Sequence, residues 1–337
     1  MSYKPPFTIT SKMINLVSEI SEALTKIEVY EHTLITPYLR KINRIKTLAG
    51  TLEIEGNFLG EEKITAILDG KRVLATVLEL AEVNGAIKAY EKFEEYDCYS
   101  LNDLLKAHKI LMGEILTTAG TFRSVNVGVG GQSGVTHVAP PFYRVPDLMC
   151  DLFEWLKSSD EHPLIKSSVF HYEFEFIHPF SDGNGRIGRL WQSAILYKWK
   201  NIFSSVPTES IVRDYQNSYY KALEDSTELG ESTPFIEFML EVILESIEKV
   251  GNKVGNKVGN KVGSKVGNDL NENQKLIIQS MSQNPKISAK KLSDIVGISV
   301  RKIEENISKL KEMRVIERVG GTRGHWKTMV SYKKTEQ

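Results

Sequence analysis

Residues 178–191, HPFSDGNGRIGRLW, constrain the fold of this chain more than any other stretch. The glycines at Gly183 and Gly185 allow positive φ angles, so successive backbone N–H groups can point toward one place. Arg186 and Arg189 are three positions apart and would share one face of a following helix. The stretch therefore predicts a tight loop that enters the first turn of a helix, where free N–H groups bind an anion.

The loop also carries two groups with chemistry of their own. Asp182 can hold a Mg²⁺ ion that bridges phosphate oxygens, because hard cations prefer carboxylate ligands. His178 would lie at the edge of such a site, where an imidazole can take a proton from an attacking hydroxyl. Together these residues predict nucleotidyl or phosphoryl transfer. The alternative is a polar loop that caps a helix, with His178 bonded to a backbone carbonyl.

The stretch resembles the signature of the Fic family, His-x-Phe-x-Asp-Gly-Asn-Gly-Arg-x-x-Arg, at every fixed position. The resemblance covers roughly residues 40–245. It implies transfer of AMP from ATP, bound with Mg²⁺, to a Ser, Thr or Tyr hydroxyl of a protein. A glycine at position 185 favours AMP transfer, since the phosphate-transferring Doc-type relatives have a lysine there. The implied roles are a general base at His178, a Mg²⁺ ligand at Asp182, contacts to the α- and β-phosphates at Gly183, Asn184 and Gly185, and contacts to the β- and γ-phosphates at Arg186 and Arg189, respectively.

A second motif lies upstream, in the sequence TLEIEGN of residues 51–57. Thr51 and Glu55 would share one helix face, and the Gly-Asn pair that follows is typical of a helix end. Alone this is an ordinary helix terminus. Beside the loop it resembles the inhibitory motif of the Fic family, which implies that Glu55 pairs with Arg189 in place of the γ-phosphate. In some members the same glutamate assists removal of AMP, and the sequence leaves that role open.

Two β-rich runs around a GGQSG turn predict a hairpin near residues 123–141 in an otherwise helical chain. A free hairpin edge can pair with an extended peptide. The resemblance places a target-docking flap here, and the alternative is a surface hairpin without a partner. The candidate docking residues are Ser133, Val135, Thr136, His137 and Val138.

Tyr219 and Tyr220 resemble the aromatic pair that the family places against adenine. A tyrosine pair on a helix more often reflects simple packing, and that alternative stays open.

Residues 249–268 repeat the sequence KVGN with a period of four, with one serine in place of asparagine. Glycine at every fourth position disfavours a helix, and a period of four does not match the alternation of a strand. We predict a flexible cationic linker, with contact to nucleic-acid phosphates as the alternative.

Residues 269–337 have the outline of a winged helix, with amphipathic helices followed by a strand–turn–strand unit. The arrangement resembles winged helix-turn-helix DNA binders. Acidic residues at Glu304 and Glu305 weaken that interpretation, and such a module can instead dock a protein. The candidate DNA contacts are Arg301, Lys302, Lys309 and Arg323.

The charge is uneven along the chain. Lysine plus arginine and aspartate plus glutamate number 43 each, yet residues 249–337 hold 19 basic against 8 acidic side chains.

The two cysteines, Cys98 and Cys150, are far apart and lack metal-ligand spacing, which favours a reducing compartment. No apolar run reaches membrane-spanning length and no secretory signal is visible, so we expect a cytoplasmic protein without membrane contact.

The expected fold is mainly α, a Fic-type helical domain with a small β-hairpin flap and a C-terminal winged helix-turn-helix domain. The expected divisions are residues 1–103 (an N-terminal helical region with the inhibitory motif), 104–248 (the catalytic core), 249–268 (the linker) and 269–337 (the winged helix). We predict an autoinhibited protein adenylyltransferase that modifies itself or a target; a homodimer is suggested by the resemblance alone. The alternatives are a DNA-binding transcriptional regulator with a nucleotide-sensing Fic domain, and a Fic enzyme that uses another donor or removes AMP.

Overall fold

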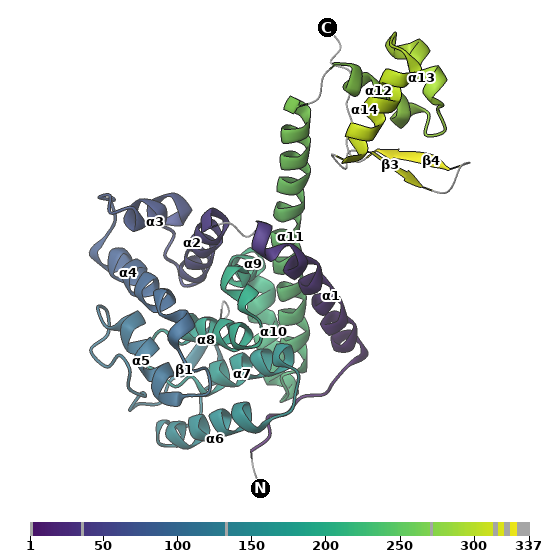
Figure 1. The fold of residues 1–337 in the computed structure, drawn as a ribbon. Helices are drawn as coiled ribbons and strands as arrows, with labels where there is room; N and C mark the ends of the chain where they lie inside the picture. The colour runs from purple at the N-terminus through teal and green to yellow at the C-terminus, as the bar shows by residue number, and fades with distance from the viewer. Residues whose placement is uncertain are drawn as a thin grey trace. The chain divides into compact units, whose positions relative to one another are not determined.

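The computed structural model describes residues 3–34, 37–131, 134–269, 272–312, 316–319 and 324–328. The chain divides into two compact units, Met1–Asn252 and Lys253–Gln337. Helices dominate the described residues, and the strands form two small antiparallel sheets, as predicted (Figure 1). The first unit includes both the predicted N-terminal region and the predicted core.

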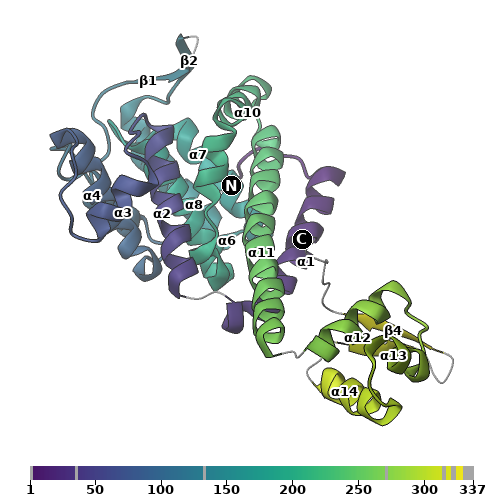
Figure 2. The same ribbon diagram turned by 90° about the horizontal axis from the view of Figure 1, so that it is seen from above.

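The first unit consists of helices and one short hairpin, which projects from the helical body (Figure 2). The helices are α1 (Ser11–Leu34), α2 (Pro37–Ile54), α3 (Gly60–Leu68), α4 (Val77–Glu91), η1 (Phe93–Glu95), α5 (Leu101–Met112), η2 (Phe142–Arg144), α6 (Val145–Ser158), α7 (Pro163–Ile177), α8 (Asn184–Trp199), η3 (Asn201–Ser205), α9 (Thr208–Asp214), α10 (Gln216–Leu229) and the first part of α11 (Thr233–Asp269). The hairpin strands are β1 (Gly128–Gly131) and β2 (Gly134–Val138), which pair antiparallel from Gly128 opposite Val138 to Gly131 opposite Gly134. The predicted hairpin is thus confirmed.

Helices α7 and α8 lie at the centre of this unit (Figure 1). Most residues of both helices are buried, as expected for helices that other elements surround on all sides. Phe170, Phe174 and Trp191 fill the core between them and are fully buried. The loop that joins these two helices is the predicted functional loop, so the best-packed part of the unit holds it at both ends.

Helix α1 runs parallel to α11 along one side of the unit (Figure 2). Lys12 near its start forms ion pairs with Glu237 and Glu241, at 3.3 and 2.8 Å. Ile27 near its end lies beside Gly251, where an added Cβ would be 3.6 Å from the isoleucine side chain.

Helix α2, which ends in the predicted inhibitory motif, packs backbone to backbone against α9. A Cβ at Gly50 would lie 2.7 Å from backbone atoms of Glu209 and Ser210, so this contact needs a glycine. Asn43 donates a hydrogen bond to the Ser205 carbonyl at 2.7 Å. These contacts fix the helix at whose end the predicted inhibitory residues lie. The helix ends at Ile54, and Gly56 takes a φ of 91°, as the Gly-Asn signal predicted.

The repeat of residues 249–268 is helical, and the prediction of a non-helical linker was wrong on this point. Helix α11 continues from Thr233 through the repeat to Asp269. The apolar first half of α11 packs into the core, so the repeat extends a helix that is already nucleated, and each added residue has only to propagate it. The division between the two units falls inside the repeat, after Asn252. In the described part of the chain, no helix is both long and apolar enough to cross a membrane.

The second unit is a winged helix, as predicted. Its elements are α12 (Glu272–Gln283), α13 (Ala289–Val296), α14 (Val300–Glu312), β3 (Ile316–Val319) and β4 (His325–Thr328). Ser288 caps α13 by accepting a hydrogen bond from the Lys291 backbone N–H, and Gly297 ends it with a φ of 74°. Strands β3 and β4 pair antiparallel, and Trp326 closes a core that includes Ile303 and Leu310.

We expect Gly85→Ala to lower the free energy of unfolding of the first unit by about 1–3 kcal/mol. A Cβ at Gly85 on α4 would lie 2.1 Å from the Leu111 carbonyl oxygen on α5, and neither backbone can move freely. The matched control is Gly251→Ala, whose Cβ would make ordinary contact with Ile27 and should stabilise by about 0.5–1 kcal/mol. Thermal and urea unfolding measure both; equal effects would show that α4 and α5 are not in close backbone contact.

Candidate functional site

The loop between α7 and α8 has an unusual backbone at both ends. His178 follows α7 with a φ of 50°, and it is the one non-glycine residue with positive φ among those described. Its N–H donates to the Phe174 carbonyl at 2.9 Å, which closes the helix. Gly183 precedes α8 with a φ of 81°. A non-glycine residue in this conformation costs free energy and is retained where the surroundings over-determine it, often at functional sites.

Asn184 and His108 hold the middle of the loop. The Asn184 side chain bonds both the N–H and the carbonyl of Phe180, each at 2.9 Å. His108 on α5 stacks on the Phe180 ring at 3.6 Å and bonds the Asp182 carbonyl through Nε2 at 3.0 Å. Burial lowers the pKa of His108 to about 4, so the ring is neutral, with Nε2 donating and Nδ1 accepting from the Gly120 N–H.

Arg123 braces the same loop from the segment before the hairpin. Its guanidinium is buried and donates to four backbone carbonyls, at 2.5 to 3.3 Å. The acceptors are the carbonyls of Val125, Pro140, Ile177 and His178. One cation thereby ties the base of the hairpin to the end of α7 and to the strained residue His178.

Arg189 lies in the buried second turn of α8 and pairs with the end of α2. Its Nη2 donates to Glu55 Oε1 at 2.6 Å and to the Thr51 carbonyl at 3.2 Å, while its Nε donates to the Thr51 hydroxyl at 3.1 Å. The Arg189 side chain is 2% exposed and that of Glu55 is 28% exposed. Burial alone would raise the pKa of Glu55, but Arg189, Arg186 and His178 together hold it below its usual value.

Gly185 makes room for this ion pair. A Cβ at this position would lie 2.4 Å from Glu55 Oε1 and 3.0 Å from a terminal nitrogen of Arg189. The absence of a side chain at position 185 therefore lets the Glu55 carboxylate enter the turn at the start of α8.

Arg186 has a carboxylate partner that sequence reasoning missed. Its Nη1 donates to Glu82 Oε1 on α4 at 3.0 Å, and its Nη2 lies 3.5 Å from Asp182 Oδ1. Asn57, two residues after Glu55, donates to the other Glu82 oxygen at 2.8 Å. The Arg186 Nε is buried and has no hydrogen-bond partner among the described residues. Nothing in the pattern around Glu82 distinguished it from other surface glutamates of a helix.

Buried titratable groups on α7 lie behind Arg189. Burial raises the pKa of Glu175 to about 8, and Arg189 offsets this in part. Burial lowers the pKa of His171 to about 3, so this ring is neutral; it bonds Gln192 at 2.6 Å and the Tyr219 hydroxyl at 3.1 Å. The net positive charge of Arg189 is thus balanced chiefly by Glu55.

Asp182 is the acidic side chain of the loop and is 56% exposed. Its Oδ1 accepts the Gly183 N–H at 2.6 Å. The described residues contain no group of three or more His, Cys, Asp and Glu side chains arranged to hold a metal. A single exposed carboxylate fits Mg²⁺, which is commonly held by one or two carboxylates together with substrate phosphates and water.

The remaining predicted site residues are placed as follows. Tyr219 is 2% exposed and packs against Phe235, so Tyr220 presents the more accessible ring of the pair. Val138 at the end of β2 is 75% exposed. Ser133 lies outside the described residues, as do the side chains of Val135, Thr136 and His137. Arg301, Lys302 and Lys309 are exposed on α14, and Arg323 lies outside the described residues.

A glycine turn with two buried arginines at the start of a helix defines an anion site of the kind that binds nucleotide phosphates. A family model described as Fic/DOC family matches residues 98–196, and one described as winged helix-turn-helix DNA-binding matches residues 270–317. A crystal structure of a Fic family protein from Desulfovibrio desulfuricans is 37% identical, with a TM-score of 0.71, over 98% of this chain and 100% of that one. The chain belongs to the Fic family.

Several relatives are named as adenylyltransferases. The protein adenylyltransferase Fic of Culex quinquefasciatus is 28% identical over 208 residues, which are 58% of this chain and 39% of that protein. The protein adenylyltransferase fic-1 of Caenorhabditis elegans is 29% identical over 201 residues, 56% of this chain and 37% of that one. The chain spans about two fifths of the length of these curated relatives.

We expect Arg123→Met to destabilise the first unit by about 2–4 kcal/mol, because each buried carbonyl left without its donor costs about 1–3 kcal/mol. The matched control is Arg144→Met, which removes an exposed guanidinium nearby and should change stability by less than about 0.5 kcal/mol. Urea unfolding measures both. Similar values for the two variants would contradict the bracing role.

Proposed function

We propose that this protein is an adenylyltransferase that moves AMP from ATP to a hydroxyl side chain of a protein, and that Glu55 inhibits it. The observation that carries the proposal is the loop itself. All fixed residues of the Fic signature lie in the braced loop or in the first two turns of α8, where Arg186 and Arg189 are buried. The named relatives support the same reaction.

In the proposed reaction, His178 takes the proton of the attacking hydroxyl. The hydroxyl oxygen forms a bond to the α-phosphorus of ATP, the bond from that phosphorus to the bridging oxygen breaks, and pyrophosphate leaves. Backbone N–H groups of Gly183, Asn184 and Gly185 hold the α- and β-phosphates, and Arg186 holds the β-phosphate. Mg²⁺ on Asp182 would neutralise phosphate charge. Such a transfer depends on positioning and charge neutralisation, which a braced loop supplies.

The inhibition follows from the charge of Arg189. In the proposed active complex this guanidinium binds the γ-phosphate. Here its Nη2 instead pairs with Glu55 Oε1 at 2.6 Å. ATP would have to displace Glu55 or bind with its γ-phosphate elsewhere, which misplaces the α-phosphorus for in-line attack. The Thr51 hydroxyl and carbonyl accept hydrogen bonds from Arg189 Nε and Nη2 and fix the geometry of the pair.

The proposed substrate is a Ser, Thr or Tyr side chain in an extended segment that pairs with the β1–β2 hairpin. The exposed Val125 and Val138 at its base support a docking role. Cys98 and Cys150 are free thiols, in keeping with a reducing compartment such as the cytoplasm.

We expect Glu55→Gly to raise AMP transfer at least tenfold, since it frees Arg189 for the γ-phosphate. The matched control is Glu53→Gly, which removes a neighbouring carboxylate that pairs with Arg213 at 2.8 Å. Transfer of label to protein from α-labelled and γ-labelled ATP measures the effect. Retention of the α label alone identifies AMP transfer, and equal activation by both variants would contradict the role of Glu55.

His178→Ala in the Glu55→Gly background should abolish transfer and leave the affinity for ATP within about threefold, because the imidazole acts on the hydroxyl and not on the nucleotide. Calorimetric titration with ATP measures the affinity. Residual transfer above one tenth of the rate of the Glu55→Gly variant would show that another group is the base.

A second function, DNA binding by the winged helix, is favoured by the exposed cations Arg301, Lys302 and Lys309 on α14 and by the matching DNA-binding family model. Arg301 lies 3.5 Å from Glu305, which reduces the positive charge of this face. We expect replacement of all three cations by alanine to weaken DNA binding and to lower its salt dependence by about two to three ions. The control is Lys286→Ala, which removes an exposed lysine outside α14. An equal loss of DNA affinity in this variant would show that α14 is not the DNA-binding face.

A further inference from the structure

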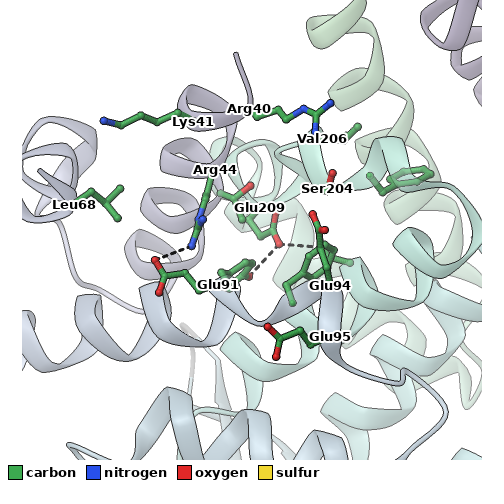
Figure 3. Close-up of a pocket in the computed structure, with 15 residues that line it drawn as sticks. Arg40, Lys41, Arg44, Leu68, Glu91, Glu94, Glu95, Ser204, Val206 and Glu209 are labelled. Carbon is green, nitrogen blue, oxygen red and sulfur yellow. Dashed lines mark hydrogen bonds and ion pairs between the residues drawn. The ribbon is translucent and has the colours of Figure 1, made fainter. Parts of the chain in front are cut away.

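A cavity of about 650 Å³ lies beside α2, and its lining residues have no role in the proposed reaction. Its walls come from α2, α3, α4, η1, α8, η3 and α9 (Figure 3). Sites for small molecules in proteins typically have volumes of about 300–1,000 Å³. The cavity is therefore large enough for a metabolite, and none of its lining residues belongs to the nucleotide loop.

The cavity has opposite charges on its two sides. Arg40, Lys41 and Arg44 come from α2 on one side, and a row of glutamates, Glu91, Glu94 and Glu95, comes from the end of α4 and from η1 on the other (Figure 3).

The cations differ in how far they are neutralised. Lys41 pairs with Asp69 at 2.8 Å, and Arg44 with Glu91 at 3.3 Å. Arg40 forms no ion pair with a carboxylate among the described residues, and the Arg44 Nε makes no hydrogen bond there, whereas its Nη2 is the atom that pairs with Glu91. The α2 side thus has donors available for an anionic group.

Glu209 lies at the floor of the cavity and is 2% exposed. Its Oε1 accepts hydrogen bonds from Tyr90 at 3.1 Å and Ser193 at 3.0 Å, whereas its buried Oε2 has no partner among the described residues. A buried carboxylate oxygen without a donor costs free energy, so a ligand that supplies an N–H group gains from filling that position.

We propose that this cavity binds a small zwitterion, such as a dipeptide with apolar side chains. Its carboxylate would face the α2 cations, and its ammonium group would face Glu209 and the glutamates of η1. The apolar lining of Leu68, Phe93, Phe203 and Val206 would take the side chains. A ligand with a single charge would leave one side of the cavity without a counter-charge.

The cavity is connected to the Glu55–Arg189 ion pair through Tyr90, which lines it, and Thr51, which does not. Tyr90, which donates to Glu209, interacts through its hydroxyl with the Thr51 side chain, and Thr51 accepts from Arg189 Nε. The same helix α2 carries both the cavity cations and the inhibitory residues. The cavity exists in the structure in which Glu55 and Arg189 are paired, and a ligand that binds this state more tightly than the unpaired one would stabilise the pairing. This regulatory consequence, unlike the site itself, rests on the proposed function.

Calorimetric titration of the full chain with leucyl-phenylalanine tests the site. We expect one bound dipeptide per chain, and at least tenfold weaker binding of the N-acetylated and of the C-amidated dipeptide. Arg44→Gln and Glu209→Gln should each weaken binding at least tenfold, whereas Arg72→Gln, an exposed arginine outside the cavity, should leave it unchanged. No binding of the zwitterion, or binding that both cavity variants retain, would overturn the proposal.

An AMP-transfer assay then tests the coupling. We expect saturating leucyl-phenylalanine to lower transfer by the wild type severalfold and to leave the Glu55→Gly variant unaffected. Equal inhibition of both, or of neither, would overturn the regulatory part. A chain that transfers no AMP even as Glu55→Gly would contradict the proposed function, while the calorimetric result would still decide the site.

Discussion

The buried charge of Arg189 is the interaction on which the arrangement of the site depends. An uncompensated guanidinium in the core is strongly destabilising, so an anion must accompany it. In this structure the anion is Glu55 at 2.6 Å, and Glu175 beside it is held largely protonated by burial, with its pKa raised to about 8. In the proposed active complex the anion is a phosphate. The two states differ mainly in which negative group meets one fixed cation, and the end of α2 decides between them.

That choice requires a rigid loop and an adjustable partner. The loop is rigid because its own backbone groups are bonded to buried side chains, chiefly those of His108, Arg123 and Asn184. The Glu55 carboxylate, at the end of α2, is more exposed than the arginine that it meets. Glycine at position 185 lets the carboxylate approach, so the same residue that shapes the proposed phosphate-binding turn also accommodates the proposed inhibitory carboxylate.

The sequence predicted the elements that depend on local signals. The glycine turn, the helix end after Ile54, the hairpin and the winged helix each have such a signal, and the structure contains all of them. Glu55 could be assigned because it occupies a fixed place in a family motif.

Other features depend on contacts between distant segments. His108 and Arg123 brace the loop across 74 and 55 positions of the chain, and Glu82 reaches Arg186 across 104. No periodicity or motif marks them, so the sequence could not identify them. The repeat is helical although its glycines disfavour a helix, because it continues a helix that is already nucleated. The composition of the repeat alone does not reveal that helix, so the prediction of a flexible linker was wrong. The cavity beside α2 draws its charges from four elements, α2, α4, η1 and α9, and the sequence could not identify it either.

The most direct test of the account is a comparison of ATP and AMP binding by calorimetry, in the wild type and in Glu55→Gly. ATP has a β- and a γ-phosphate that AMP lacks, and Arg189 is proposed to bind the γ-phosphate. If Glu55 and the γ-phosphate compete for Arg189, the substitution should tighten ATP binding at least tenfold and change AMP binding less than twofold. An equal gain for both nucleotides, or no gain for ATP, would contradict the claim that this one ion pair controls the site.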